Sequence, residues 1–426
     1  MLRSKLIFIF LFLFSSFASA SLDELHHWID NNHLKDNSSI SLSPEITHSL
    51  LRDVKEKKFV FLGEPDHYFH EKYIYRLAFI KELLSLGFYN IYAELGVFDG
   101  MRVNQYLETG DEKYLKQVGL YGFKYGEPLV YREDAFVDEV VRYFKELRKL
   151  KRLYPKLKYG GFDLDMYPGT GYLDFDQFSK REDVINFANK NNKFLNSINL
   201  IKKAQQETEL ALIELNLAVG LSQAIESRDE GVEFIKDYDQ FLFFYKIFKD
   251  SFTFKREIQI IPLNWGVFAW REERMFEIMS NILSHHNEKD KYILLGHNGH
   301  LLKSDALNRE GKRYTDWDTI GAWITKKFPN DVFAIWSLIG QGEHRGHGCP
   351  GRTTCSIELI PGTLENDLYS ISSDNPIYFK NSSVLKKVEN EIKTIVNGVS
   401  VTSGKYGDYA DAFYFLPNVT DLQKED

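Results

Sequence analysis

Several features are absent from this sequence of 426 residues, and each absence argues against a class of protein. No apolar run after residue 20 is long enough to cross a membrane, so we expect no membrane span in the mature protein. No basic run or basic tail offsets the net charge of -8, which argues against a general binder of nucleic acids or of anionic membranes. No G-x-S-x-G motif occurs, so we do not expect a nucleophilic serine on a strand-to-helix turn.

Cysteine is scarce, and the only two cysteines, Cys349 and Cys355, lie close together in the segment HRGHGCPGRTTCSIEL. Neither follows a predicted strand with a base beside it, which disfavours a cysteine nucleophile. We predict that the pair forms a disulfide that closes a short loop. His344 and His347 in the same segment leave a second interpretation open, a Cys2His2 metal site.

The first 20 residues have the pattern of an export signal. Two basic residues, Arg3 and Lys5, precede an apolar run over residues 6–14, and small residues at positions 18–20 form a cleavage pattern. The run is too short for a good transmembrane helix. We therefore predict a signal peptide over residues 1–20 and export to a periplasm or out of the cell. An uncleaved membrane anchor is the alternative.

Residues 21–426 are predicted to form an α/β domain with a mostly parallel central sheet and flanking helices. Short apolar runs that suit buried strands alternate with helical patterns, and they lie at 59–62, 89–93, 157–162, 291–296, 332–339 and 409–416. Residues 181–249 are almost wholly helical in pattern, so we predict an inserted helical hairpin or bundle over about 181–250. The tyrosine-rich segment 118–128 and the aromatic run 241–245 could border a cleft, although a surface loop and plain core explain them equally well.

The segment from residue 58 to 96 contains several candidate catalytic residues. Glu64 and His67 directly follow its first predicted strand, and Glu94 stands at the end of its second. Ligands of open α/β sheets bind beyond the carboxyl ends of parallel strands. We therefore expect Glu64, His67 and Glu94 to lie together. Asp163 or Asp165, after the third strand, should reach the same edge, although such aspartates are more often helix caps.

A second motif, Gly296-His297-Asn298-Gly299-His300, resembles Gly63-Glu64-Pro65-Asp66-His67 in its layout. In both, a glycine ends a strand and a polar pair three residues apart follows, so each pair shares a face if the backbone turns into a helix. Pro65 suits the first position of a helix, and a helix that starts there favours the neutral imidazole of His67. Arg76 can join this site only if residues 68–70 are not part of the same straight helix, or if it reaches over the helix start.

These residues predict hydrolysis by activated water. His67 is expected to act as the general base, because its neutral ring can take a proton near neutral pH. Glu64 or Glu94 would hold the other ring nitrogen and so select the tautomer. His297 and His300 would hydrogen-bond a developing oxyanion or orient the water.

The same residues resemble the erythromycin esterase family. The resemblance runs in order through GEPDH, the helix that carries Arg76, GFYNIYAEL, GFDLD, WREERMFEIMSNIL, GHNGH and GDYADAFYFL. It implies an α/β core with helical insertions, an open cleft and metal-independent hydrolysis of a small-molecule lactone or other ester. It also implies the site residues: His67 as general base, its supports Glu64, Arg76 and Glu94, and His297 and His300 around the reacting carbonyl.

Some features depart from the family pattern. Asp66 precedes the histidine where members usually carry a small or hydroxyl residue. The export signal, the segment 118–128 and the loop between Cys349 and Cys355 are not expected of macrolide-inactivating enzymes. We therefore expect a distant member whose substrate is not erythromycin.

Two other functions remain open. The first is metal-dependent hydrolysis of the TraB/Tiki type, with His67, Glu94, His297 and His300 as ligands of a divalent ion such as zinc, and His67 and His70 as a possible ligand pair on one helix. The second is a non-catalytic, exported binding protein for haem or another ligand, like the ChaN-like proteins. The esterase-like interpretation, which we favour, needs no cofactor.

Overall fold

The computed structural model describes the following residues of the chain: 34–35, 41–118, 134–165, 171–230, 235–260, 265–304, 308–309, 312–313, 317–345, 349, 354–372, 374–381, 393–396, 400–403 and 406–423. The chain divides into two compact units. Unit 1 comprises Met1–Ile91, Glu133–Leu157 and Asn287–Asp426, and unit 2 comprises Tyr92–Arg132 and Lys158–His286. The predicted signal peptide and nearly all of segment 118–128 lie outside the described residues.

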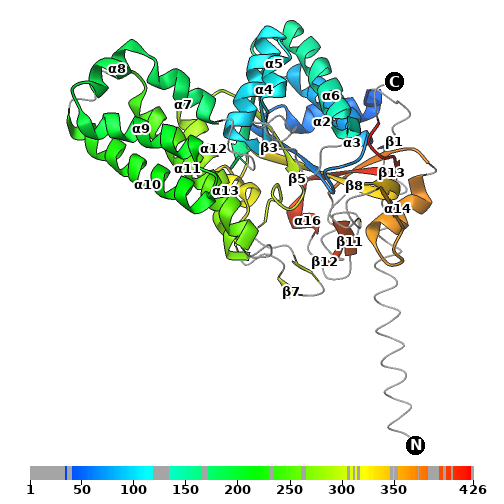
Figure 1. The fold of residues 1–426 in the computed structure, drawn as a ribbon. Coiled ribbons are helices and arrows are strands. Elements are labelled where there is room, and N and C mark those ends of the chain that lie inside the picture. The colour runs from blue at the N-terminus through cyan, green and yellow to red at the C-terminus, as the bar shows by residue number, and fades with distance from the viewer. Residues whose placement is uncertain are drawn as a thin grey trace, which may run out of the picture. The chain divides into compact units, whose positions relative to one another are not determined.

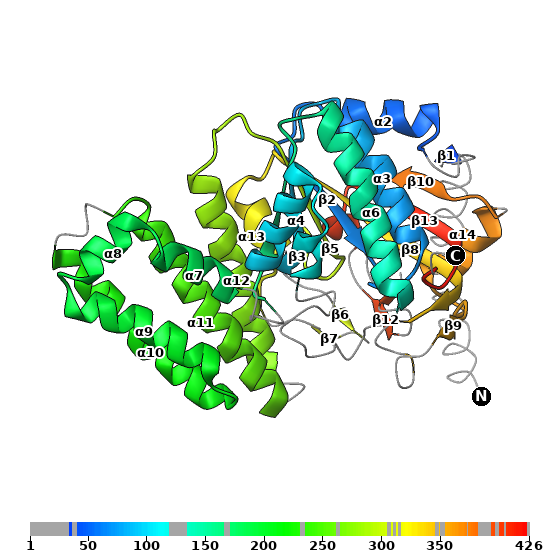
Figure 2. The ribbon, with the colours of Figure 1, turned by 45° about the horizontal axis from the view of Figure 1, so that its top comes forward.

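Unit 1 is built on a sheet whose strands follow the order β1-β10-β13-β8-β2-β5 (Figures 1 and 2). The central four strands, β13, β8, β2 and β5, are parallel to one another, whereas β10, β1 and β9 are antiparallel to their neighbours. The bounds are β1 (Leu34–Lys35), β2 (Phe59–Glu64), β5 (Tyr292–His297), β8 (Val332–His344), β9 (Cys355–Ile357), β10 (Ile377–Lys380) and β13 (Ala412–Val419). The predicted mostly parallel central sheet is confirmed.

The parallel strands are buried because helices cover the sheet. All six residues of β2 and all six of β5 are buried, as is typical of parallel strands. Figure 2 shows α3 and α6 side by side over the strands, where they pack together. The helices of unit 1 are α2 (Pro44–Val54), α3 (Glu71–Leu84), α6 (Asp134–Leu153), α13 (Ile320–Lys327), α14 (Leu364–Ser372) and α16 (Tyr406–Tyr409).

A small antiparallel sheet of unit 1 was not predicted. Its strands follow the order β11-β12-β6-β7, with bounds Lys393–Val396, Ser400–Ser403, Asn308–Arg309 and Lys312–Arg313. These strands have only two to four residues each, and β1, β9 and β10 are equally short. A search for apolar runs of ordinary strand length therefore does not detect them.

Unit 2 is mostly helical and contains the predicted insertion, which extends beyond its expected limits at both ends. The chain passes from unit 1 into unit 2 within β3 (Asn90–Gly96). The other elements are α4 (Val97–Thr109), α5 (Lys113–Lys116), β4 (Lys158–Asp163), α7 (Gly171–Ser179), α8 (Glu182–Ala188), α9 (Asn192–Gln206), α10 (Leu210–Glu226), η3 (Ser227–Glu230), α11 (Tyr238–Ile260) and α12 (Trp265–Ser284). Figures 1 and 2 show α9 and α10 side by side.

The helices of the insertion share an aromatic core. Phe194 of α9, Phe175 of α7 and the α11 residues Phe241, Tyr245 and Phe248 are buried in one cluster. Phe241 and Tyr245 of the aromatic run 241–245 are therefore core residues, which was the second of the two interpretations of this run. Among the described residues, no helix has the length and apolar character needed to cross a membrane.

Two segments expected to turn into helices do not. Helix α3 begins at Glu71, so the helix predicted from Pro65 does not form, and residues 65–69 follow an irregular path. Residues 298–300 form a turn after β5. The polar pairs of the two motifs are therefore brought together by loops and by strand register.

Candidate active site

Glu64 and His67 form a hydrogen-bonded pair at the carboxyl end of β2. Glu64 is the last residue of the strand and is 3% exposed, and its Oε1 lies 2.5 Å from Nδ1 of His67. An ionised carboxylate only accepts hydrogen bonds, so Nδ1 of His67 carries a proton, and in the neutral ring Nε2 has the lone pair. The His67 side chain is 29% exposed. The arrangement is that of an imidazole base oriented by a carboxylate.

Arg76 and Lys72 hold the second oxygen of Glu64. Nη2 of Arg76 lies 2.8 Å and Nζ of Lys72 lies 3.4 Å from Oε2. Burial by itself would raise the pKa of Glu64, but Arg76, Lys72 and His67 outweigh it and keep that pKa far below its ordinary value. Lys72 also donates a hydrogen bond to the carbonyl oxygen of His67.

Arg76 can join the site because residues 68–70 are not part of the helix that carries it, which is the condition stated from the sequence. Since residues 65–69 are irregular and α3 begins only at Glu71, Arg76 faces Glu64 although it lies nine positions after His67. Lys72 was not singled out from the sequence. Lys72 and Arg76 are four positions apart, which places both side chains on one face of α3. This spacing could have indicated from the sequence that Lys72 belongs to the site.

The parallel pairing of β2 and β5 brings His297 opposite Glu64. The rings of His297 and His67 are 5.5 Å apart, and those of His297 and His300 are 6.2 Å apart. The main-chain N–H of Gly299 donates to Nδ1 of His297, and Nε2 donates to the carbonyl oxygen of Pro65, both at 3.1 Å. These bonds select the neutral tautomer with the proton on Nε2.

The hydrogen bonds of His297 do not suit the ligand of a metal ion. A metal needs a ring nitrogen with an available lone pair, and in His297 that lone pair accepts from Gly299. His70, proposed with His67 as a ligand pair on one helix, lies outside helix α3, and its Nδ1 is 2.8 Å from Oε1 of Glu139. Glu139 raises the pKa of His70 by this hydrogen bond, against the effect of burial.

Asn298 is a further buried residue that the sequence analysis did not assign to the site. Its main-chain N–H donates to the carbonyl oxygen of Glu64, and its side-chain amide donates to the carbonyl oxygen of Ser337 in β8. A Cβ at Gly63 would lie 2.2 Å from Oδ1 of Asn298. Glycine at position 63 thus allows Asn298 to link the ends of β2 and β5 to the middle of β8.

Asp66 binds the main chain of the site and a distant histidine. Its Oδ1 accepts from the N–H of His67 at 2.5 Å and from that of Tyr68 at 3.3 Å, and its Oδ2 lies 2.6 Å from Nδ1 of His344. Burial would raise the pKa of Asp66, but His344 and His67 outweigh it and lower this pKa. The side chain of Asp66 thus satisfies two main-chain donors of the irregular segment.

The predicted disulfide between Cys349 and Cys355 is present, with the Cα atoms 5.5 Å apart. The two sulfurs are bonded to each other and are not thiolate ligands in this structure, and they lie with a ring nitrogen of His344 within 4.8 Å of one another. His344 contacts the disulfide, and His347 lies outside the described residues.

Glu94 and Asp163 belong to an ion-pair cluster in unit 2. Nη2 of Arg271, on α12, lies 2.9 Å from Oε1 of Glu94, and Nε lies 2.9 Å from Oδ1 of Asp163. Burial would lower the pKa of Arg271, but Asp163 and Glu94 outweigh it and raise that pKa. The sequence analysis did not assign Arg271 a role. The support of His67 by Glu94 stays a prediction.

Asp165 caps a helix, the more ordinary of its two predicted roles. Its carboxylate oxygens accept from the main-chain N–H groups of Phe98 and Asp99 in the first turn of α4, at 3.3 and 3.1 Å. Burial and the neighbouring Asp99 raise the pKa of Asp165 well above its ordinary value. A Cβ at Gly96 would lie 2.1 Å from Oδ1 of Asp165, so the glycine makes room for the cap.

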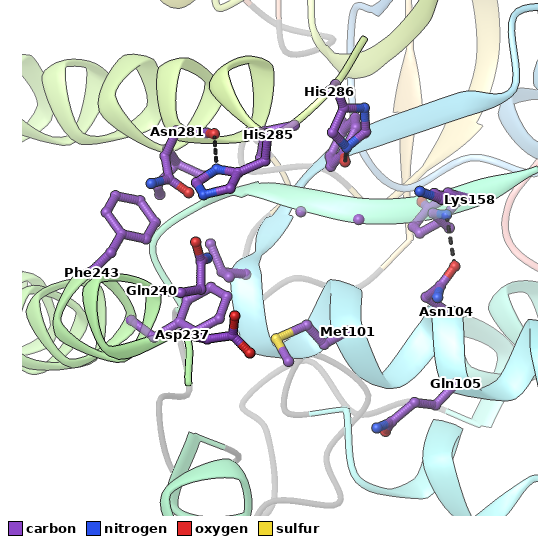
Figure 3. Close-up of a pocket in the computed structure, with 18 residues that line it drawn as sticks. Met101, Asn104, Gln105, Lys158, Asp237, Gln240, Phe243, Asn281, His285 and His286 are labelled. Carbon is purple, nitrogen blue, oxygen red and sulfur yellow. Dashed lines mark hydrogen bonds between the residues drawn. The ribbon is translucent and has the colours of Figure 1, made fainter. Parts of the chain in front are cut away.

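Unit 2 also contains a pocket of about 560 Å³ (Figure 3). Figure 3 shows Gln240 and Phe243 on one side and Met101 and Asn104 on another, with Lys158 at the first position of β4. Asp163 ends the same strand and is not part of the lining. The pocket and the Arg271 cluster therefore lie toward opposite ends of β4. Phe243 and Phe244, from the aromatic run 241–245, border the pocket.

The chain thus has a mostly parallel α/β core with a carboxylate–imidazole pair at the end of one strand. The chain belongs to the erythromycin esterase family, whose family model matches residues 85–413. Membership of this family suggests a hydrolase.

Solved structures share the fold at low sequence identity. A Bacillus cereus protein aligns with a TM-score of 0.70 and 15% identity over 95% of this chain and 99% of its own. A protein described as a succinoglycan biosynthesis protein aligns with a TM-score of 0.70 and 14% identity, over 95% and 98%. A mutant of the erythromycin esterase EreC in its open conformation aligns with a TM-score of 0.65 and 14% identity, over 92% and 98%. The search of curated proteins found no match.

Proposed function

We propose that this protein is a hydrolase that cleaves a small-molecule ester or lactone with water activated by His67. The reaction uses no covalent serine or cysteine intermediate and no metal ion. The observation that carries the proposal is the hydrogen bond between Oε1 of Glu64 and Nδ1 of His67, at 2.5 Å, in a site where His67 remains partly exposed.

The pair performs the proton transfers of hydrolysis. With Nδ1 bound to Glu64, Nε2 of His67 removes a proton from water as the water attacks the carbonyl carbon. The imidazolium that forms is stabilised by the Glu64 carboxylate. The same Nε2 then returns the proton to the leaving oxygen when the carbon–oxygen bond breaks.

Lys72 and Arg76 keep Glu64 in its ionised form. Their contacts with Oε2 leave Oε1 for His67 and prevent the buried carboxylate from taking up a proton near neutral pH. A protonated Glu64 would not stabilise the imidazolium. The two cations thus support the base through Glu64 and have no contact with the reacting atoms in this scheme.

His300 is the candidate donor to the oxyanion. Its side chain is only partly buried, and its ring lies next to that of His297. Nε2 of His297 donates a hydrogen bond to the carbonyl oxygen of Pro65. We therefore propose that His297 stabilises the turn that carries His67. One donor aimed at a developing oxyanion contributes about 100-fold or more to the rate of comparable reactions.

The test is an assay of the purified protein against nitrophenyl esters and lactones, with and without EDTA, beside the His67→Ala variant. We expect hydrolysis that survives EDTA and falls by at least about 100-fold in the variant. Full activity in the variant would refute the general-base assignment. Loss of activity with EDTA would favour the metal-dependent alternative, and an absorbance band on mixing with haemin would favour the binding protein.

A further inference from the structure

The disulfide of unit 1 lies directly against a buried histidine. The sulfurs of Cys349 and Cys355 are each 3.4 Å from Nε2 of His344, whose side chain is fully buried. His344 is the last residue of β8 and pairs with Cys355 in β9. The disulfide therefore restrains one side of the imidazole ring.

The other side of the ring is bound to the loop that carries the proposed base. Nδ1 of His344 lies 2.6 Å from Oδ2 of Asp66, whose Oδ1 accepts the main-chain N–H of His67 at 2.5 Å. Asp66 is 1% exposed. A second link runs parallel, since the main-chain N–H of Arg345 donates to the carbonyl oxygen of Tyr68 at 3.1 Å. A continuous chain of contacts thus joins the disulfide to the backbone of His67.

We propose that Cys349–Cys355 is a thiol–disulfide exchange site whose oxidation state sets the position of His67 through His344 and Asp66. Asp66 and His344 are positioning residues in this scheme, and neither contacts the reacting atoms. The effect on hydrolysis rests on the proposed function, whereas the effect on the position of His67 does not.

The exchange reaction requires a dithiol as reductant. Cys355 is partly exposed, whereas Cys349 is buried, so the thiolate of the dithiol attacks Sγ of Cys355. The bond between the two protein sulfurs breaks, and Cys349 leaves with the electron pair and takes up a proton. The second thiol of the reagent then releases Cys355 as a thiol. The protein gains two electrons and two protons, and the dithiol becomes a cyclic disulfide.

Reduction removes the covalent restraint that holds both sulfurs against His344. The ring then gains freedom on that side, and so does the carboxylate of Asp66 that depends on it. The distance between Glu64 and His67 is set by the backbone that Asp66 holds. Since displacement of a catalytic group by about 1 Å can cost 100-fold in rate, we expect reduction to lower kcat/KM roughly tenfold.

The first experiment compares the oxidised protein, the protein reduced with dithiothreitol, and the Cys349→Ser/Cys355→Ser double variant in the nitrophenyl ester assay. We expect the same loss of kcat/KM in the last two, and no further effect of dithiothreitol on the double variant. Reoxidation of the reduced protein should restore the rate. If the double variant does not fold, the reduced and reoxidised wild-type protein still gives the answer.

The second experiment is independent of catalysis and observes His67 itself. In protein labelled at histidine, the ring signals of His67 are identified by their absence in His67→Ala. We expect these signals to shift on reduction, whereas those of His48, which is exposed on α2, stay in place. A shift without any hydrolysis would refute the proposed function and retain the positioning network.

Two variants separate the network from general loosening of this region. Asp66→Asn keeps an oxygen for the N–H of His67, but its amide group cannot accept from Nδ1 of His344, so we expect a reduced rate that no longer responds to dithiothreitol. Asp421→Asn weakens the contacts of Asp421 with Arg345 and Thr354 and leaves Asp66 and His344 untouched, so we expect a normal rate and a normal response. Unchanged His67 signals after complete reduction, verified by thiol titration, would overturn the proposal, as would the same loss of rate in Asp421→Asn.

Discussion

Oε1 of Glu64 and Nδ1 of His67 lie 2.5 Å apart, at a strand end where two buried cations hold the other carboxylate oxygen. This relationship makes one carboxylate both the partner of a histidine and the counter-ion of Arg76 and Lys72. Its removal is therefore expected to affect activity and stability together.

The Glu64→Gln variant tests that double role. A glutamine oxygen can still accept from Nδ1 of His67, but it cannot stabilise the imidazolium, so we expect kcat/KM to fall by about 100-fold. The variant also leaves Arg76 and Lys72 without their buried counter-ion, which should lower the free energy of unfolding by about 3 kcal/mol. Enzyme kinetics and urea unfolding measure the two effects. Glu56→Gln, at an exposed position, is the matched control and should change neither.

The low pKa of Glu64 predicts acid sensitivity. Above its ordinary value of 4.5 the carboxylate is ionised in both the folded and the unfolded protein, and its contacts contribute fully to stability. Below that pH the unfolded chain takes up the proton first, because the pKa in the folded protein is lower. We expect the difference in unfolding free energy between wild type and Glu64→Gln to shrink as the pH falls from 6 to 3. A difference that is constant over this range would contradict the prediction.

The pair of His70 and Glu139 predicts the opposite dependence. Glu139 raises the pKa of His70 above its ordinary value of 6.5, so the contact contributes fully below that pH and is lost as the pH rises through the folded-state pKa. His70→Asn should therefore cost more unfolding free energy at pH 6 than at pH 9. Urea unfolding at the two pH values measures this, and an equal loss at both would contradict the prediction.

Arg271 is expected to stabilise unit 2. Arg271→Met would leave the buried Asp163 and the partly buried Glu94 without their common cation, which should lower the free energy of unfolding by about 3 kcal/mol. Addition of Asp163→Asn to this variant should recover part of the loss, because one uncompensated charge is then removed. If the double variant is no more stable than Arg271→Met, the ion pair is not the cause.

Glu94→Gln tests the role that the sequence assigned to Glu94. If Glu94 supports His67, kcat/KM should fall while the variant remains folded under assay conditions. Thermal unfolding has to be followed in parallel, because Glu94 also binds Arg271. A normal rate in the folded variant would leave Glu94 with a structural role only.

Two departures from the family pattern meet at one contact. Asp66 differs from the small or hydroxyl residue expected before the histidine, and the cysteine loop is also unexpected. In the structure Asp66 and His344, the residue that contacts both cysteines, form a hydrogen bond although they are 278 positions apart. The two departures are thus parts of one arrangement, which their sequence positions do not indicate.

The sequence alone determined the features that depend on local pattern. Buried apolar runs predicted the central strands because parallel strands covered on both faces need continuous apolar residues. Helical periodicity predicted the inserted helices, and the close spacing of Cys349 and Cys355 predicted the disulfide. The proximity of Glu64 and His67 followed from their positions at one strand end.

Only the tertiary structure decided the rest, because it depends on partners far apart in the chain. Asp66 binds His344, 278 positions away at the end of β8, and Asn298 donates to the carbonyl oxygens of Glu64 and Ser337. His297 uses both ring nitrogens on main-chain groups, one of them 232 positions away at Pro65. No local pattern encodes these pairs, since each one forms only when the sheet places the ends of separate strands side by side.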